Sequence, residues 1–263
     1  MKNATYNQIG IGYNDTRSAD PYLTNRIVKL IDGRKGYNYL DIGCGTGNYT
    51  CALSEKGLNI MGIDPSDVML KEAYKKGSNV IWVNGHAESL PFGENKFDGI
   101  IGTLTLHHWT DIGLAFVEMR RVLKPGGKLV FFTSTPEQTN GYWLKHYFPD
   151  IIRKSVEVLP KLEILEQAAK HVGLDILVTE KYEVREDLQD HFLFVGKHNP
   201  ELYFEKHIRQ GISSFSALAN EKEVNQGLQM LRRDIDAGKF EEIKRRYDNN
   251  EGDYLFVVFG EPA

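Results

Sequence analysis

Tyr39-Leu-Asp-Ile-Gly-Cys-Gly-Thr-Gly-Asn-Tyr49 is the stretch of this sequence that decides the fold. An apolar run ends in an acid, Asp41, and passes at once into three glycines on alternate positions, followed by the start of a helix. Glycine tolerates the positive φ of a tight turn and lets a ligand approach the backbone. The helix behind the turn directs its free N–H groups and positive dipole end at that ligand. Strand, glycine turn and helix together predict an α/β protein with a nucleotide-like ligand.

The segment from Asn59 to Asp64 is predicted to be a second strand that also ends in an acid. Seventeen residues separate Gly47 from Asp64, which suits one βαβ crossover and brings the Asp64 carboxylate beside the glycine turn. An ionised carboxylate at this place can accept hydrogen bonds from both ribose hydroxyls of a nucleoside. A purely structural role as a helix cap is less attractive, because Ser66 already stands at the N-cap position.

Further strands are predicted at Val80 to Val83, Phe97 to Gly102 and Lys128 to Thr133. The order and spacing of these pieces resemble the class I S-adenosylmethionine (SAM)-dependent methyltransferases, and within them the ubiquinone-biosynthesis-like, or type 11, family. The resemblance covers about residues 37 to 134. It implies an α/β protein with a Rossmann-like, seven-stranded, doubly wound sheet. It also implies an enzyme that uses SAM and releases S-adenosylhomocysteine (SAH).

The same resemblance implies which residues contact the cofactor. Asp41 and the glycine turn would surround the amino-acid end of SAM, Asp64 would hold the ribose, and the segment around Ala87 would line the adenine. His86 departs from the family pattern, which has an aspartate there; a neutral imidazole can accept a hydrogen bond through one nitrogen only. The residues expected at the cofactor are Tyr13, Asp41, Gly43, Cys44, Gly45, Asp64, Pro65, Met69, His86, Ala87 and Thr103.

Methyl transfer from a sulfonium requires the acceptor, the methyl carbon and the sulfur in line, with water excluded. No metal is expected. An acceptor that is a hydroxyl, an amine or an acidic carbon requires a base as well. His107 follows the fourth predicted strand, where the methyl group should emerge, and histidine suits proton removal near neutral pH. His107 is therefore the candidate catalytic residue, and the alternative is a loop histidine without a catalytic role.

Two segments beyond the resemblance are rich in aromatic residues and predict a helical cap over the methyl group. The cap has two candidate inward-facing rings, Trp143 and Phe192, although such rings can also form a small separate core. The chain then divides into a SAM-binding core with an N-terminal flap at 1–134, a cap segment at 135–160, a return to the core at 161–184, a helical cap insertion at 185–253 and a last core strand at 254–263.

An aromatic cap favours a small and partly apolar acceptor. The net charge of −4 argues against a chain that coats nucleic acid, and there is no apolar run or signal region for a membrane. We therefore expect a cytoplasmic protein with neither partner, and its oligomeric state stays open. The alternatives are a tRNA- or rRNA-modifying methyltransferase and a SAM-binding protein without transferase activity. An NAD-dependent reductase is disfavoured, because Asn48 stands where that motif has its third glycine.

Overall fold

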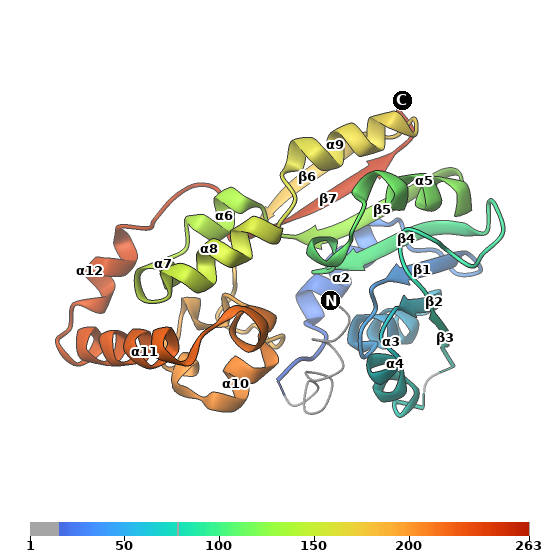
Figure 1. The fold of residues 1–263 in the computed structure, drawn as a ribbon. Helices are drawn as coiled ribbons and strands as arrows, with labels where there is room; N and C mark the ends of the chain where they lie inside the picture. Colours follow the sequence, from blue (N-terminus) through green and yellow to red (C-terminus); the bar gives the residue numbers. More distant parts are fainter. Residues whose placement is uncertain (1–15, 78, 263) are drawn as a thin grey trace.

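The computed structural model describes residues 16–77 and 79–262 of the 263-residue chain. Seven strands form one sheet in the order β3-β2-β1-β4-β5-β7-β6, with helices on both faces (Figure 1). The first five strands pair in parallel, and β7 is antiparallel to both of its neighbours. The predicted doubly wound, Rossmann-like sheet is confirmed. Its strands are β1 (Asn38–Ile42), β2 (Asn59–Asp64), β3 (Ile81–Asn84), β4 (Phe97–Thr103), β5 (Leu123–Thr133), β6 (Asp175–Tyr182) and β7 (Tyr254–Gly260).

Side chains alternate between the two faces of the sheet, as the period of a strand requires. In β5, Leu129 and Phe131 belong to one apolar core, whereas Val130 and Phe132 belong to the other. The first core lies under α5 (Ile112–Val122) and α9 (Leu162–His171). The second lies under α2 (Pro21–Leu30), α3 (Asn48–Glu55) and α4 (Asp67–Tyr74). Both faces of the central strands are therefore covered, which leaves the ends of these strands for a ligand.

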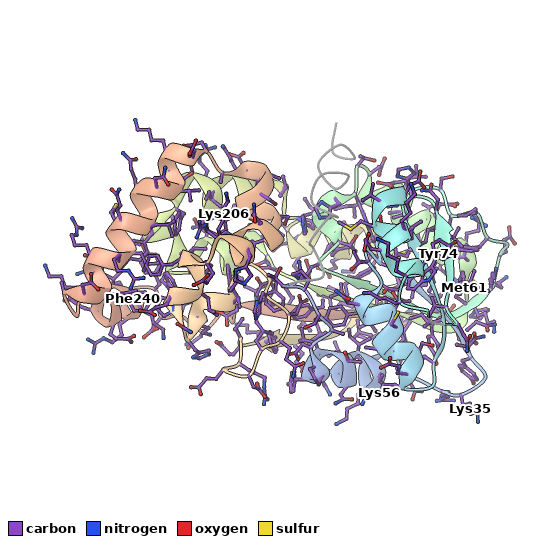
Figure 2. The ribbon with its side chains drawn as sticks, turned by 90° about the horizontal axis from the view of Figure 1, so that it is seen from below. Lys35, Lys56, Met61, Tyr74, Lys206 and Phe240 are labelled. Carbon is purple, nitrogen blue, oxygen red and sulfur yellow. The ribbon has the colours of Figure 1, made fainter. Side chains whose placement is uncertain are left out.

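The remaining helices lie beyond one end of the strands, as the left side of Figure 1 shows. We refer to residues 135–160 and 185–253 as the cap. Figure 2 shows Lys206 and Phe240 of the cap at one end of the molecule, with Lys35 and Lys56 near the other. The cap contains α6 (Pro136–Asn140), α7 (Leu144–Tyr147), α8 (Pro149–Val158), η3 (Val195–Lys197), η4 (Pro200–Phe204), α10 (Lys206–Gly211), the π-helical turn η5 (Ser214–Leu218), α11 (Glu221–Asp236) and α12 (Phe240–Arg245).

The direction of β7 explains why both cap segments meet. Because β7 is antiparallel to β5, it begins where β5 ends, and Leu255 pairs with Thr133. The last residue of β6, Tyr182, pairs with the first residue of β7, Tyr254. Both cap segments therefore leave the sheet at the carboxyl ends of the parallel strands. There α8 packs on η5, and α7 packs on α11. Among the residues described, no helix is long and apolar enough to cross a membrane.

The cap has an aromatic core of its own. Tyr142 stacks on Phe194 with ring centroids 3.8 Å apart, and Trp143 meets Phe240 edge to face at 4.9 Å. Only 2% of Trp143 is exposed, and its neighbours are other cap residues. The expectation that Trp143 faces the acceptor is therefore wrong, because this ring fills the core that holds the cap together.

Gly227 allows a close approach between α11 and the end of α7 in the cap. A Cβ atom at this position of α11 would lie 2.4 Å from the carbonyl oxygen of Tyr147 and 2.5 Å from the ring of Phe148. We expect Gly227→Ala to lower the free energy of unfolding by about 1–3 kcal/mol, because overlap with backbone outweighs the gain in helix propensity. Thermal unfolding should shift down by roughly 2–10 °C. The control is Gln226→Ala, on an exposed position of the same helix, which should leave the transition in place.

Candidate active site

One cavity of about 950 Å³ lies at the carboxyl ends of β1, β2 and β4 and continues under the cap. Its volume is at the upper end of the range for ligand pockets. The structure brings all of the described residues that the sequence assigned to the cofactor or to catalysis to this cavity. They are Asp41, Gly43, Cys44, Gly45, Asp64, Pro65, Met69, His86, Ala87, Thr103 and His107. Tyr13 lies outside the described residues.

Gly43 and Gly45 of the turn both have a positive φ, but their surroundings differ. Gly43 has a φ of 69°, and a Cβ atom there would lie 1.9 Å from Oγ1 of Thr105. Gly45 has a φ of 54°, but a Cβ atom there would meet no protein atom within 4 Å. Gly43 is therefore required by the packing of the protein itself. Gly45 lines the cavity and has open space beside it, so its backbone is accessible to a ligand.

Asp64 is held in place by the backbone. Its Oδ2 accepts a hydrogen bond from the N–H of Gly45 at 2.9 Å, and its Oδ1 accepts one from the N–H of Ser66 at 2.9 Å. Burial raises the pKa of Asp64, and these two N–H groups oppose the rise. Since each oxygen has a further lone pair, the fixed carboxylate can still accept two hydroxyl donors, as a ribose requires.

Two buried oxygens in the cavity wall indicate a ligand with hydrogen-bond donors. Oδ2 of Asp41 accepts a hydrogen bond of 2.6 Å from Thr50, at the start of α3. Oδ1 of Asp41 and Oγ1 of Thr103 are buried and have no hydrogen-bond partner among the residues described. Burial raises the pKa of Asp41 to about 7, against the hydrogen bond from Thr50 and with a smaller contribution from the charge of Asp64. A buried acceptor without a donor costs roughly 1–3 kcal/mol, which a bound ammonium group would recover.

The first turn of α3 provides a partial positive charge, which is opposite in sign to the carboxylate of Asp41. Its N-cap is Gly47, which has no side chain to cap the helix, and Asn48 and Tyr49 line the cavity. Free N–H groups at a helix start favour an anion. A carboxylate at this turn and an ammonium at Asp41 are the two charges of an amino acid. The residues present therefore fit the amino-acid end of SAM.

His107 lies in the short 3₁₀ turn η2 (Leu106–His108) that follows β4. Its half-buried ring lines the cavity and lies against that of His108, with centroids 3.8 Å apart. His86 is exposed at the rim, close enough to Asp64 for its charge to favour the ionised carboxylate. Both loops line the same cavity as the glycine turn and the cap.

Beyond these loops the wall of the cavity is made of apolar and hydroxyl side chains. Phe192 lines it, as the sequence predicted. Hydroxyl groups there bond to each other: Ser134 with Thr139 at 2.9 Å, and Ser155 with Ser214 at 2.9 Å. The wall consists of Thr133, Ser134, Thr139, Ser155, Val158, Leu159, Phe192, Leu193, Ile212, Ser213, Ser214, Ala217, Leu218 and Tyr254.

An ion pair that the sequence did not predict joins the cap to the segment before α2 and, through hydrogen bonds, to α3. Asp190 of the cap, 1% exposed, pairs with Arg17, whose Nη2 donates to Oδ2 at 3.1 Å. The hydroxyl of Tyr49 donates to the same oxygen at 3.1 Å, and Asn48 donates to the carbonyl of Arg17 at 2.9 Å. All four residues line the cavity. Arg17 lies before the first helix, where a flap was expected, but nothing in the sequence around Asp190 indicates its role.

Comparison with known proteins agrees with this geometry. Residues 40–131 match a family model described as a methyltransferase domain. The demethylmenaquinone methyltransferase of Staphylococcus carnosus is 31% identical over 214 residues, which is 77% of this chain and 83% of the relative. A crystal structure of a putative methyltransferase from an antibiotic biosynthesis pathway of Anabaena variabilis is 31% identical with a TM-score of 0.82, over 94% of this chain and 99% of that one. The [4+2]-cyclase SpnF shares the fold at 20% identity and a TM-score of 0.56, over 92% of this chain and 81% of that one.

The two glycines predict different outcomes for the same substitution. Gly45→Ala should weaken SAH binding at least tenfold, because the methyl group occupies ligand space, while left-handed backbone costs about 1–2 kcal/mol of stability. Gly43→Ala should mainly lower the unfolding temperature, because its methyl group overlaps Thr105. Differential scanning fluorimetry and titration calorimetry separate the effects. Unaltered SAH affinity in folded Gly45→Ala would contradict the close approach of a ligand at Gly45.

Proposed function

The chain belongs to the type 11 family of SAM-dependent methyltransferases, and we propose that it methylates a small, uncharged and partly apolar molecule held between the sheet and the cap. The observation that carries this proposal is the single cavity that joins the glycine turn to the cap. A cofactor at one end and an acceptor at the other would meet inside one enclosed space, which direct methyl transfer requires.

The fixed polar groups of the cavity suggest how SAM would bind. We assign the ammonium of SAM to Asp41, its carboxylate to the first turn of α3, and its ribose to Asp64. Met69 and Ala87 are buried apolar residues of the same wall and suit the adenine ring. When bound, SAM supplies an electrophilic methyl group. The protein's task is to hold the acceptor in line with it and to keep water out.

The acceptor half is poor in charge, which supports an uncharged acceptor. Among the cap residues that line the cavity, the only charged side chain is Asp190, and Arg17 neutralises it. A phosphate or ammonium group in this part would lose its hydration without gaining an opposite charge. The same argument disfavours a nucleotide of tRNA or rRNA. A neutral molecule with oxygen atoms would instead find hydroxyl partners at Ser134 and Ser155.

His107 is the proposed base, because it lines the cavity at the turn that follows β4. If the acceptor is a hydroxyl, an imidazole nitrogen of His107 would take its proton while the methyl carbon exchanges its bond to the sulfur of SAM for one to the oxygen, with SAH as the leaving group. If the acceptor is an acidic carbon, the same nitrogen takes the C–H proton. Such a base contributes typically 10²–10⁴-fold to a rate.

The relatives suggest which neutral molecules to test first. The S. carnosus relative is named for demethylmenaquinone, and the A. variabilis structure for an antibiotic biosynthesis pathway. We therefore propose a hydroquinone as the first acceptor class. Incubation with SAM and 1,4-dihydroxynaphthalene, under anaerobic reducing conditions, should yield SAH and a methylated product by mass spectrometry. A carboxylated analogue should not react. SAM binding with no turnover on any neutral acceptor would favour the binding protein without transferase activity.

Two variants separate the proposed roles. Asp64→Ala removes the charged acceptor of two hydroxyls and should weaken SAH binding by about 2–3 kcal/mol, some thirty- to hundredfold. His107→Gln should leave SAH affinity unchanged and lower kcat by about 10²–10⁴-fold. Calorimetry with SAH and SAH release under saturating SAM provide the two measurements. Full activity of His107→Gln would show that another group, or water, takes the proton.

The raised pKa of Asp41 predicts that cofactor binding depends on pH. With its pKa near 7, the free protein binds a proton at this carboxyl below neutral pH, whereas an ammonium partner favours the ionised form. SAH binding should therefore release a proton, and affinity should fall by about fivefold from pH 7 to pH 6 and level off above pH 8. Calorimetry in buffers of different ionisation enthalpy measures the released proton. Asp41→Asn should bind more weakly and lose this pH dependence.

A further inference from the structure

We propose that Ser214 is a specificity-determining residue of the acceptor site, and that its hydroxyl donates a hydrogen bond to an oxygen of the acceptor other than the atom that is methylated. The inference rests on the proposed function only in taking the cap half of the cavity as the acceptor site. It deepens that function by naming, within the pair formed by Ser155 and Ser214, the hydroxyl that has a hydrogen to give. It also assigns a role to the π-helical turn η5, which carries Ser214.

Ser214 is a buried residue in the wall of the cavity. It is 9% exposed and is the first residue of η5. Ser155 of α8 donates to Oγ of Ser214 at 2.9 Å and to the carbonyl oxygen of Ile151 at 2.8 Å, so its single hydrogen is shared between these two acceptors. The hydrogen of Ser214 has no acceptor in the described part of the chain. Because a hydroxyl hydrogen rotates about the C–O bond, it can turn to an oxygen atom in the cavity.

The pair of Ser134 and Thr139 in the same wall has no such spare hydrogen. Oγ of Ser134 lies 3.2 Å from the carbonyl oxygen of Asp253 and 2.9 Å from Oγ1 of Thr139. When Ser134 donates to this carbonyl, Thr139 donates to Ser134, and both hydrogens are used. An acceptor oxygen at this pair would replace an existing hydrogen bond, whereas one at Ser214 would add a hydrogen bond. The added bond contributes more to affinity than the exchanged one.

The turn that carries Ser214 is held on both sides. After it, α8 packs on η5, and Nζ of Lys154 donates to the carbonyl oxygen of Leu218, the last residue of η5, at 2.8 Å. Before it, a Cβ atom at Gly211 would lie 1.9 Å from Oγ1 of Thr16, so the chain here lies close against the segment before α2. Turns of π-helix are rare and occur frequently at functional sites. A hydroxyl on such a fixed turn loses little freedom when it binds a ligand.

The chemistry of methyl transfer indicates which oxygen Ser214 would bind. The methylated atom must direct a lone pair at the methyl carbon, and a hydrogen bond accepted by that atom would make it a weaker nucleophile. An oxygen elsewhere in the acceptor can keep its hydrogen bond from Ser214 throughout the reaction. His107, the proposed base, lies on η2 after β4, whereas Ser214 lies on the cap. Two separate elements would therefore hold two separate groups of the acceptor.

The test compares 1,4-dihydroxynaphthalene with 1-naphthol, which lacks the second oxygen. Dissociation constants are measured by calorimetry with saturating SAH under anaerobic reducing conditions. The native protein should bind the diol about three- to tenfold more tightly, as one added hydrogen bond predicts. In Ser214→Ala this ratio should fall below twofold, while the SAH affinity stays the same. Ser216→Ala is the matched control, because Ser216 is an exposed residue of the same turn that does not line the cavity; it should keep the ratio.

Steady-state kinetics provide a second readout. A hydrogen bond that is equally strong in the ground state and the transition state affects KM and not kcat, so Ser214→Ala should raise the KM of the diol about three- to tenfold and leave kcat within twofold.

A native protein that binds the two probes equally, or binds neither, would overturn the proposal. An equal loss of affinity for both probes in Ser214→Ala would also overturn it, because this residue would then have a structural role. A loss of the ratio in Ser216→Ala would have the same consequence. Discrimination that depends on Ser214, without methylation of either probe, would support the site while rejecting a hydroquinone as the methylated molecule. The two proposals can therefore fail separately.

Discussion

The contact between Gly43 and Thr105 sets the geometry of the whole site. It joins the turn after β1 to the loop after β4, two strands that are neighbours in the sheet but not in the chain. At this place the strand order reverses, and open α/β sheets bind ligands there because the connecting helices diverge to opposite faces. Because the two loops touch, the ends of β1 and β4 bring Asp41 and Thr103 to one cavity. A side chain at position 43 would overlap Thr105, so the close contact of the two loops depends on this glycine.

A second constraint ties the cap to the cofactor half. The ion pair of Arg17 with Asp190 is largely buried, and the hydroxyl of Tyr49 completes the hydrogen bonds of the carboxylate. Loss of one partner would leave a buried charge without compensation, which is strongly destabilising. Tyr49 lies in the first turn of α3, beside the proposed place of the SAM carboxylate. The cap and the cofactor helix thus share one polar network, so a displacement of either changes the cavity between them.

The described residues that the sequence assigned to the cofactor share one cavity because the signals that picked them are local. Most of them lie at the end of a strand or in the loop after it, and Asp64 needs only one crossover to reach the glycine turn. The cap lacks such signals. Trp143 and Phe192 are both aromatic residues of predicted cap segments, yet Trp143 fills the core of the cap and Phe192 lines the cavity. Asp190 is 173 residues from its partner Arg17. Only the packing of distant segments decides such roles.

The two halves of the cavity differ in the polar groups that line them. The cofactor half places charges and oriented N–H groups where a charged ligand needs them. The acceptor half keeps its hydroxyls bonded to each other, as in the pair of Ser155 with Ser214, so that it loses little when water leaves. A hydroxyl in such a pair can exchange its partner for an oxygen of the acceptor at small cost, whereas an unpaired buried charge could not. The neutral acceptor that we propose would therefore be recognised by shape, apolar contact and exchangeable hydrogen bonds in this half.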